Sequence, residues 1–194
     1  MRVLVGCEFS GTVRDAFIHL GHDAVSCDLL PSESSLGPHI QGDILDIINS
    51  DSWDLLICHP PCTYLSCAGN RYFKNNPERC QKRLEAFNFA MSLFNCGIPK
   101  ICMENPTGYL CSHFRKPDQI INPYQFGDNE LKRTCLWLKG LPKLYYTVQY
   151  PKMPEPHYIR YDQRCGSIPF RCTKPFRNGP EQFGFAFGYA CRVS

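Results

Sequence analysis

The most distinctive stretch of the sequence for chemistry is DLLICHPPCTYLS, in which Cys62 directly follows Pro60 and Pro61 at the end of an apolar run. Each proline fixes one backbone φ angle and removes one amide donor, so the pair stiffens the loop and gives the thiol one position and direction. This pattern predicts a cysteine nucleophile, which would need a nearby positive charge or helix terminus to ionise at neutral pH. The alternative is that Cys62 is one small buried thiol among thirteen cysteines.

A carboxyl group at the end of a second strand would give this thiol a partner. The stretch PKICMEN reads as a strand with Glu104 at its carboxyl end, followed by Asn105 and Pro106. Glu104 could hydrogen-bond a ring nitrogen of a heterocycle while the thiolate adds to the ring, which suits an electron-poor base as substrate. The alternative for Glu104 is an exposed charge at a strand end.

The elements around these residues alternate between short strands and helices. Apolar runs predict strands over residues 2–6, 24–30, 39–45, 53–61, 99–105 and 134–140. Helical spacing predicts helices over 12–21 and 77–95, the second with a core stripe of Leu84, Phe87, Met91 and Phe94. This alternation predicts an α/β fold with a parallel sheet.

The polar residues of interest follow the predicted strands, where open α/β sheets bind ligands. These strand-end residues are Gly11, Asp28, Asp43, Cys62 and Glu104. A turn at Gly11 would let the backbone approach a nucleotide-like ligand, and Asp28 could accept both ribose hydroxyls. The segment GCEFSGTVRD lacks the G-x-G-x-x-G pattern, so a pyrophosphate is not specifically predicted. A turn that simply packs is the alternative.

The charge of the chain is segregated along its length. Residues 1–131 carry ten Lys and Arg against fifteen Asp and Glu, whereas residues 132–177 carry ten against two. Aromatic residues are interleaved with the second block, at Tyr145, Tyr146, Tyr150, Tyr158, Tyr161, Phe170 and Phe176. Basic and aromatic residues together favour nucleic acid as the partner, and a merely solvated basic face is the alternative.

The cysteines and apolar runs indicate the compartment and limit the class of protein. An odd cysteine count with no leader sequence favours free thiols in a reducing compartment. Zinc is a competing explanation, but no Cys-x-x-Cys pair occurs, so we expect no metal site. The apolar runs are only of strand length, which predicts no membrane span and a soluble, cytoplasmic protein.

The order of the motifs EFSG, Asp28, QGDI, HPPCTYLS and MENP resembles that of the cytosine-C5 DNA methyltransferase family, in particular its short phage and prophage forms. The resemblance covers roughly residues 1–140 and implies a Rossmann-like, parallel-sheet methyltransferase fold that uses S-adenosylmethionine. Residues 141–194 would be an irregular basic segment of the same compact unit, serving as a reduced target-recognition region. A phage-encoded member would act in the bacterial host cytoplasm.

The resemblance also implies roles for individual residues. Cys62 would add to C6 of a flipped-out cytosine and Glu104 would contact its N3/N4 edge, after which C5 takes the methyl group. The implied cofactor-binding residues are Phe9, Ser10, Gly11 and Thr12 at the methionine end, Asp28 at the ribose, Asp43 at the adenine amine, and Pro60 beside the catalytic loop. The implied DNA contacts are Arg133, Lys132, Thr63 and Ser66, of which Arg133 lies in the place of the family's Gln-x-Arg-x-Arg strand.

Two other functions stay open. The family's further glycines are replaced by Thr12, Val13 and Arg14, and FGFAFGYACRVS has no clear counterpart of the family's closing motif. Both departures favour a non-catalytic relative that binds nucleic acid or a host-defence protein. The small recognition region favours instead a cytosine-C5 modifying enzyme that uses another one-carbon donor or a free nucleotide.

Overall fold

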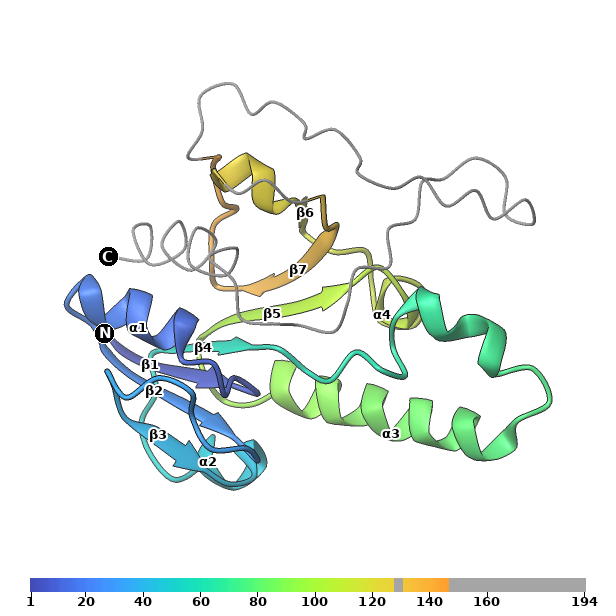
Figure 1. Cartoon of the computed structure of the whole chain (residues 1–194), viewed down its shortest axis with the longest axis horizontal. Helices are drawn as coiled ribbons and strands as arrows, with labels where there is room; N and C mark the ends of the chain where they lie inside the picture. Colours follow the sequence, from blue (N-terminus) through green and yellow to red (C-terminus); the bar gives the residue numbers. More distant parts are fainter. Residues whose placement is uncertain (128–130, 147–194) are drawn as a thin grey trace.

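The fold is organised around one seven-stranded sheet with strand order β3-β2-β1-β4-β5-β7-β6 (Figure 1). The computed structural model describes residues 1–127 and 131–146. The strands are β1 (Arg2–Gly6), β2 (Asp23–Asp28), β3 (His39–Gln41), β4 (Leu55–Cys58), β5 (Lys100–Pro106), β6 (Gln119–Ile121) and β7 (Thr134–Lys139). The helices are α1 (Thr12–His19), α2 (Ile44–Ile47), α3 (Pro77–Phe94) and α4 (Tyr109–His113), with the 3-10 helices η1 (Cys67–Tyr72) and η2 (Pro123–Phe126).

The first five strands are parallel, which confirms the predicted α/β fold class. β1 pairs with β2 and β4, and β4 pairs in turn with β5, all in parallel register. The predicted strand over 134–140 is confirmed as β7, but it runs antiparallel to β5 and joins β6 to the sheet. The result is a parallel core of strands with an antiparallel edge, a common arrangement in α/β proteins.

Alternating side chains of each strand reach the two faces of the sheet. Val3 and Val5 of β1 pack in the core cluster that includes Phe17 of α1, whereas Leu4 packs in the cluster that includes Leu93 of α3. α1 and α3 therefore cover opposite faces (Figure 1). Strands buried on both sides in this way explain why the sequence shows continuous apolar runs rather than alternation.

The core stripe predicted for α3 is partly wrong. Leu84 is 47% exposed, and the buried residues of the helix are Ala90, Leu93 and Phe94. Figure 1 shows the first half of α3 extending past the strands, so its early apolar positions have no sheet to cover. The helix itself begins as predicted, with Pro77 in its first turn and the Asn76 side chain accepting a hydrogen bond from the Arg79 amide at 2.9 Å.

Two further predictions need correction or stay open. The predicted strand over 39–45 stops at Gln41, because Asp43 caps α2 by accepting from the Leu45 amide at 2.9 Å. The short elements η1, α4, β6 and η2 were not predicted. The division at residue 140 remains a prediction, since residues 147–194 lie outside the described residues.

Candidate active site

The candidate site lies at the carboxyl ends of β4 and β5, which are adjacent parallel strands. In their register Cys58 pairs with Met103, so His59 and Glu104 are the next residues of the two strands. Cys62 follows three residues after His59, on the loop that leaves β4. The two predicted catalytic residues, Cys62 and Glu104, are thus brought to one edge of the sheet.

His59 is a residue of the site that the sequence analysis did not identify. Its Nδ1 lies 3.3 Å from Oε2 of Glu104, and the two side chains are 16% and 9% exposed. Its other ring nitrogen, Nε2, is buried and has no hydrogen-bond partner in the described part of the chain. Protonated at Nδ1, the imidazole donates to Glu104 and fixes the orientation of that carboxyl group.

The predicted catalytic loop, residues 59–66, is held by the strand that carries Glu104. Asn105, which is 1% exposed, donates from Nδ2 to the carbonyl oxygen of Pro60 at 2.7 Å. The carbonyl of Cys62 accepts from the amides of Leu65 and Ser66 at 3.0 and 2.8 Å, which closes a turn directly after the thiol. The prolines therefore stiffen one side of Cys62 and backbone hydrogen bonds stiffen the other.

The thiol of Cys62 is partly buried, and its pKa is raised above the ordinary value of a cysteine. The main cause is burial, and the second is the negative charge of Glu104; the positive charge of Lys132 opposes both. This influence shows that Glu104 and Lys132 both lie near the sulfur. Burial and Glu104 therefore both favour the protonated thiol over the thiolate.

The turn between β1 and α1 is stabilised by a second buried carboxylate, Glu8. Its oxygens accept from the Val13 amide at 2.6 Å, the Arg14 amide at 3.3 Å and the Ser10 hydroxyl at 3.2 Å. Burial raises the pKa of Glu8, while these hydrogen bonds and the nearby His59 lower it. Because Glu8 occupies the first amides of α1, these amides do not offer a site for phosphate.

Gly11 takes the left-handed conformation that the predicted turn requires, with φ 77°. A Cβ atom at this position would lie 2.8 Å from Cβ of Ser34 and would also meet the Arg14 guanidinium. The Phe9 carbonyl accepts from the Glu33 amide at 2.9 Å, so the loop after β2 is fastened onto this turn.

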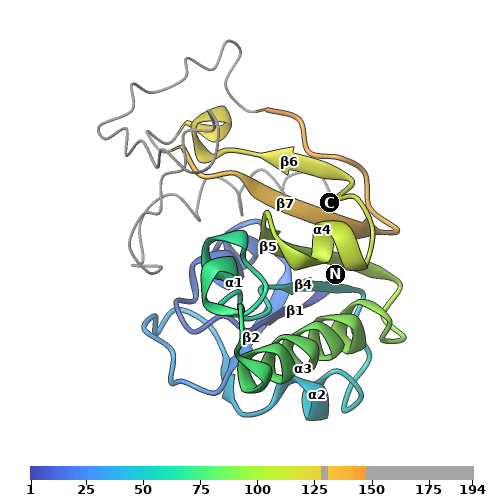
Figure 2. The ribbon, with the colours of Figure 1, turned by 90° about the vertical axis from the view of Figure 1, so that its right-hand side faces the viewer.

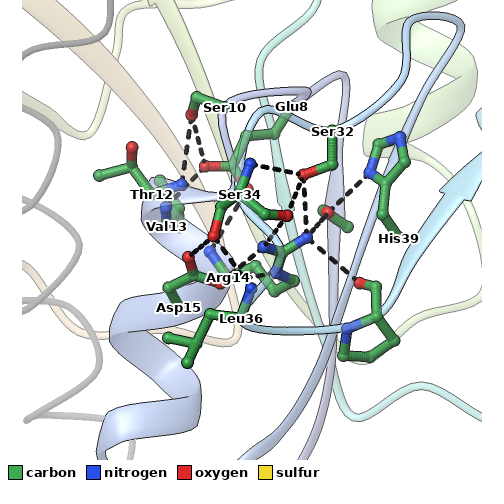
Figure 3. Close-up of polar contacts among 12 residues, drawn as sticks. Glu8, Ser10, Thr12, Val13, Arg14, Asp15, Ser32, Ser34, Leu36 and His39 are labelled. Atoms are coloured by element: carbon green, nitrogen blue, oxygen red, sulfur yellow. Dashed lines mark hydrogen bonds and ion pairs between the residues drawn. The ribbon is translucent and has the colours of Figure 1, made fainter.

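Arg14 stands where the resemblance led us to expect a glycine, and it is completely buried. Its guanidinium is bonded to Asp15 at 2.7 Å and to Ser26 at 2.9 Å, and it also reaches the loop residues Ser32, Ser34 and Pro38 (Figure 3). The charge of Arg14 is thus used to hold the loop after β2.

The two predicted cofactor carboxylates lie near Cys7, at the end of β1. Burial raises the pKa of the Cys7 thiol to about 12, with further contributions from the charges of Asp28 and Asp43. Asp28 accepts from the Leu30 amide at 3.0 Å. Cys7 itself has φ 58°, an unusual conformation for a residue with a side chain, at the point where β1 turns toward α1.

The predicted DNA contacts also lie beside the catalytic loop. Lys132 is near Cys62, and Arg133 is near enough to Cys67 to lower the pKa of its thiol, which burial raises. Thr63 is exposed, whereas the Ser66 hydroxyl accepts from the Ala68 amide at 3.2 Å and caps η1. The remainder of the predicted basic segment, from residue 147, lies outside the described residues.

Other features predicted from the sequence can be examined in residues 1–127 and 131–146. Within these ranges no group of three or more His, Cys, Asp or Glu is placed to hold a metal ion. The ten cysteines found there are all free thiols. No helix in this part of the chain has the length and apolar character needed to cross a membrane.

No protein-family model and no curated protein matches the sequence. Among solved structures, the chain is similar to a protein encoded within an E. coli prophage and assigned as a DNA modification methyltransferase, with 17% identity and a TM-score of 0.48. The alignment covers 92% of this chain and 62% of that one, so this chain spans less than two thirds of the other's length.

Proposed function

We propose that the protein is a DNA (cytosine-5-)-methyltransferase that transfers a methyl group from S-adenosylmethionine through a covalent adduct at Cys62. The observation that carries this proposal is the placement of a thiol and a carboxyl group at the ends of adjacent parallel strands. They are close enough for the charge of Glu104 to raise the pKa of Cys62. An electron-poor ring is a substrate whose addition chemistry needs a nucleophile and a proton donor side by side.

The chain's own residues account for the ring chemistry. Glu104 takes the proton of the Cys62 thiol and passes it to N3, which withdraws electrons from C6. The sulfur, now a thiolate, bonds to C6, so the electron pair of the C5–C6 double bond becomes available at C5. After C5 has taken the methyl group, a water molecule takes the C5 proton and expulsion of the sulfur restores the ring, while the proton on N3 returns through Glu104 to the sulfur.

His59 acts in this proposal as a positioning residue. Its hydrogen bond to Oε2 of Glu104 leaves the other carboxyl oxygen to face the base. Asn105 has an equivalent effect on the nucleophile because it anchors the carbonyl of Pro60. Errors of about 1 Å in such positions can slow an enzyme by about 100-fold, so both side chains matter without touching the reacting atoms.

The residues around Gly11 fit S-adenosylmethionine better than a phosphate-bearing cofactor. Glu8 occupies the first amides of α1, and S-adenosylmethionine has no phosphate that would require them. Asp28 and Asp43 supply carboxylates for a ribose diol and an adenine amine at the ends of β2 and β3. When bound, the cofactor supplies an electrophilic methyl group.

The test is nucleoside mass spectrometry on DNA from bacteria that lack cytosine methylation of their own and express this chain. We expect new 5-methylcytosine from the wild type and none from the Cys62→Ala variant. A different added mass on cytosine would refute S-adenosylmethionine as the donor but would agree with covalent attack by Cys62. Unmodified DNA in cells with abundant, folded protein would refute the proposal and favour a non-catalytic relative.

A further inference from the structure

Three arginines of residues 71–83 lie against aromatic rings next to the catalytic loop. Arg79 lies 5.1, 5.4 and 5.1 Å from the ring centres of Tyr64, Tyr72 and Phe73, measured from Cζ. Arg71 lies 4.7 Å from the ring of Tyr72, and Arg83 lies 3.3 Å from the ring of Phe73. We call Arg71, Tyr72, Lys74 and Arg79 the arginine–aromatic surface, and Arg83 its anchor.

None of these three arginines pairs with a carboxylate of the described residues. By contrast, Arg2, Arg14 and Arg115 each form a salt bridge with an aspartate. Arg79 is the clearest case, because its Nε is buried and has no hydrogen-bond partner in the described part of the chain. A guanidinium held between rings and left without an anion is prepared to bind one.

The arginine–aromatic surface is rigidly connected to the loop that carries Cys62. Arg83 donates from Nε to the carbonyl of Tyr64 at 2.8 Å and from Nη2 to Oδ1 of Asn70 at 2.7 Å, which ties α3 to η1 and to the loop. Tyr64 is only two residues after Cys62. Figure 2 views the molecule from the end where β4 gives way to η1 and α3. The surface therefore packs against the loop residue Tyr64, which follows Cys62 by two positions.

The charge and exposure of this region fit a polyanion that also carries planar rings. Residues 71–83 contain five Lys and Arg but one acid, Glu78, which pairs with Lys82 at 2.6 Å. Lys74 is exposed and without a partner among the described residues, and the Tyr72 side chain is 52% exposed. Guanidinium groups bind phosphates, and exposed tyrosines stack on unpaired bases.

We infer that the arginine–aromatic surface binds the DNA strand that carries the target cytosine, next to the base itself. Arg79 and Lys74 bind its phosphates, and Tyr72 stacks on a neighbouring base that is unpaired when the target is extruded. This inference rests on the proposed function for the identity of the polyanion. It adds a strand-binding site in the first half of the chain, separate from Lys132 and Arg133.

The test is fluorescence anisotropy with a short fluorescein-labelled DNA duplex containing cytosine, using full-length Cys62→Ala protein without cofactor. In this background Lys74→Gln and Arg79→Gln should each lower the slope of log affinity against log salt concentration by about 0.7 to 0.9, the value for one lost phosphate contact. Lys116→Gln, which neutralises an exposed lysine before β6, is the matched control and should keep the slope.

The role of the ring is tested by a second matched pair on the single strand of the same DNA. Tyr72→Ala should bind about tenfold more weakly, and Tyr72→Phe should bind as the parent does. Wild-type slopes in both Lys74→Gln and Arg79→Gln would overturn the inference, as would a parent protein that fails to bind DNA. Lys74 is exposed and has no hydrogen-bond or ion-pair partner among the described residues, so Lys74→Gln should not impair folding. Its salt dependence therefore tests the inference even if Arg79→Gln is unstable.

These outcomes are separable from failure of the proposed function. Binding needs neither Cys62 nor the cofactor, whereas 5-methylcytosine in cellular DNA needs both. If the protein binds DNA through Arg79 but leaves cytosine unmodified, the binding surface is supported and the proposed reaction is refuted. If the protein methylates DNA but Lys74→Gln and Arg79→Gln both keep the parent's salt dependence, the reaction is supported and the binding surface is refuted.

Discussion

Replacing Arg14 by methionine tests whether the buried ion pair at the start of α1 holds the candidate cofactor turn together. Arg14 is fully buried, and its partner Asp15 is 14% exposed. Removing one partner of a buried pair costs about 3 to 5 kcal/mol, because the other charge stays buried without compensation. Asp15 keeps a hydrogen bond from Ser34, so we expect the lower end, about 3 kcal/mol. Methionine has a similar volume, and no large cavity term is added.

The same reasoning predicts a small effect for Arg2→Met, which serves as the control. Arg2 pairs with Asp51, but the two side chains are 41% and 37% exposed, and such pairs contribute at most about 1 kcal/mol. For a chain of this size Arg14→Met should lower Tm by about 6 to 12 °C. Arg2→Met should lower it by less than about 4 °C.

Urea unfolding followed by tryptophan fluorescence measures both variants, since Trp53 and Trp137 are buried and report loss of the core. A second readout is hydrogen exchange over residues 29–38, which should speed up in Arg14→Met because this loop loses three hydrogen bonds from the guanidinium. If Arg14→Met and Arg2→Met had equal free energies of unfolding, the network in Figure 3 would not be what stabilises the turn.

Three further predictions concern the catalytic loop and its neighbour strand. Because the charge of Glu104 raises the pKa of Cys62, Glu104→Gln should lower that pKa and speed iodoacetamide alkylation of Cys62 at pH 8, as followed by peptide mass spectrometry; a slower reaction would contradict the assigned contact. Asn105→Ala should cost about 1 to 3 kcal/mol in urea unfolding, because it leaves the Pro60 carbonyl without its hydrogen bond; an unchanged midpoint would refute this. His59→Gln should lower kcat for methyl transfer about tenfold or more with little change in cofactor KM, and a selective change in KM would argue against the positioning role.

The positions of Cys62 and Glu104 could be predicted from the sequence because both follow apolar runs that form parallel strands. In a parallel sheet all carboxyl ends lie at one edge, so the predicted strands alone place both residues at that edge. That the two residues are neighbours there depends on the pairing of β4 with β5. The Gly11 turn was predictable for a local reason, since a glycine between a strand and a helix favours positive φ.

His59 and Asn105 could not be found in this way because their roles depend on register. His59 contacts Glu104 only because Cys58 pairs with Met103, and no local pattern encodes that pairing. The histidine directly after the strand, before the two prolines, was the available signal. Glu8, in the motif EFSG, had no predicted role, because its acceptance of the Val13 amide five residues later depends on the geometry of the turn.

The buried positions predicted for α3 were partly wrong for a different reason. Helical spacing identifies which residues share a face, but it does not reveal how much of the helix lies over the sheet. The first half of α3 extends beyond the strands, and its side chains there meet the loop and η1, as Arg83 does with Tyr64. The same misjudged half of the helix carries part of the arginine–aromatic surface.

The raised pKa of Cys62 is compatible with a nucleophilic role if the thiol passes its proton to Glu104 during the reaction. The negative charge of Glu104 disfavours the thiolate, so the thiol holds its proton while that charge is present. In the proposed reaction this proton passes to Glu104 and on to N3, which removes the repulsion and leaves the nearby Lys132 to favour the thiolate. The two states of the pair differ by the position of one proton. In this scheme the thiol becomes reactive only when a base occupies the site, which would protect it from oxidation and stray alkylation.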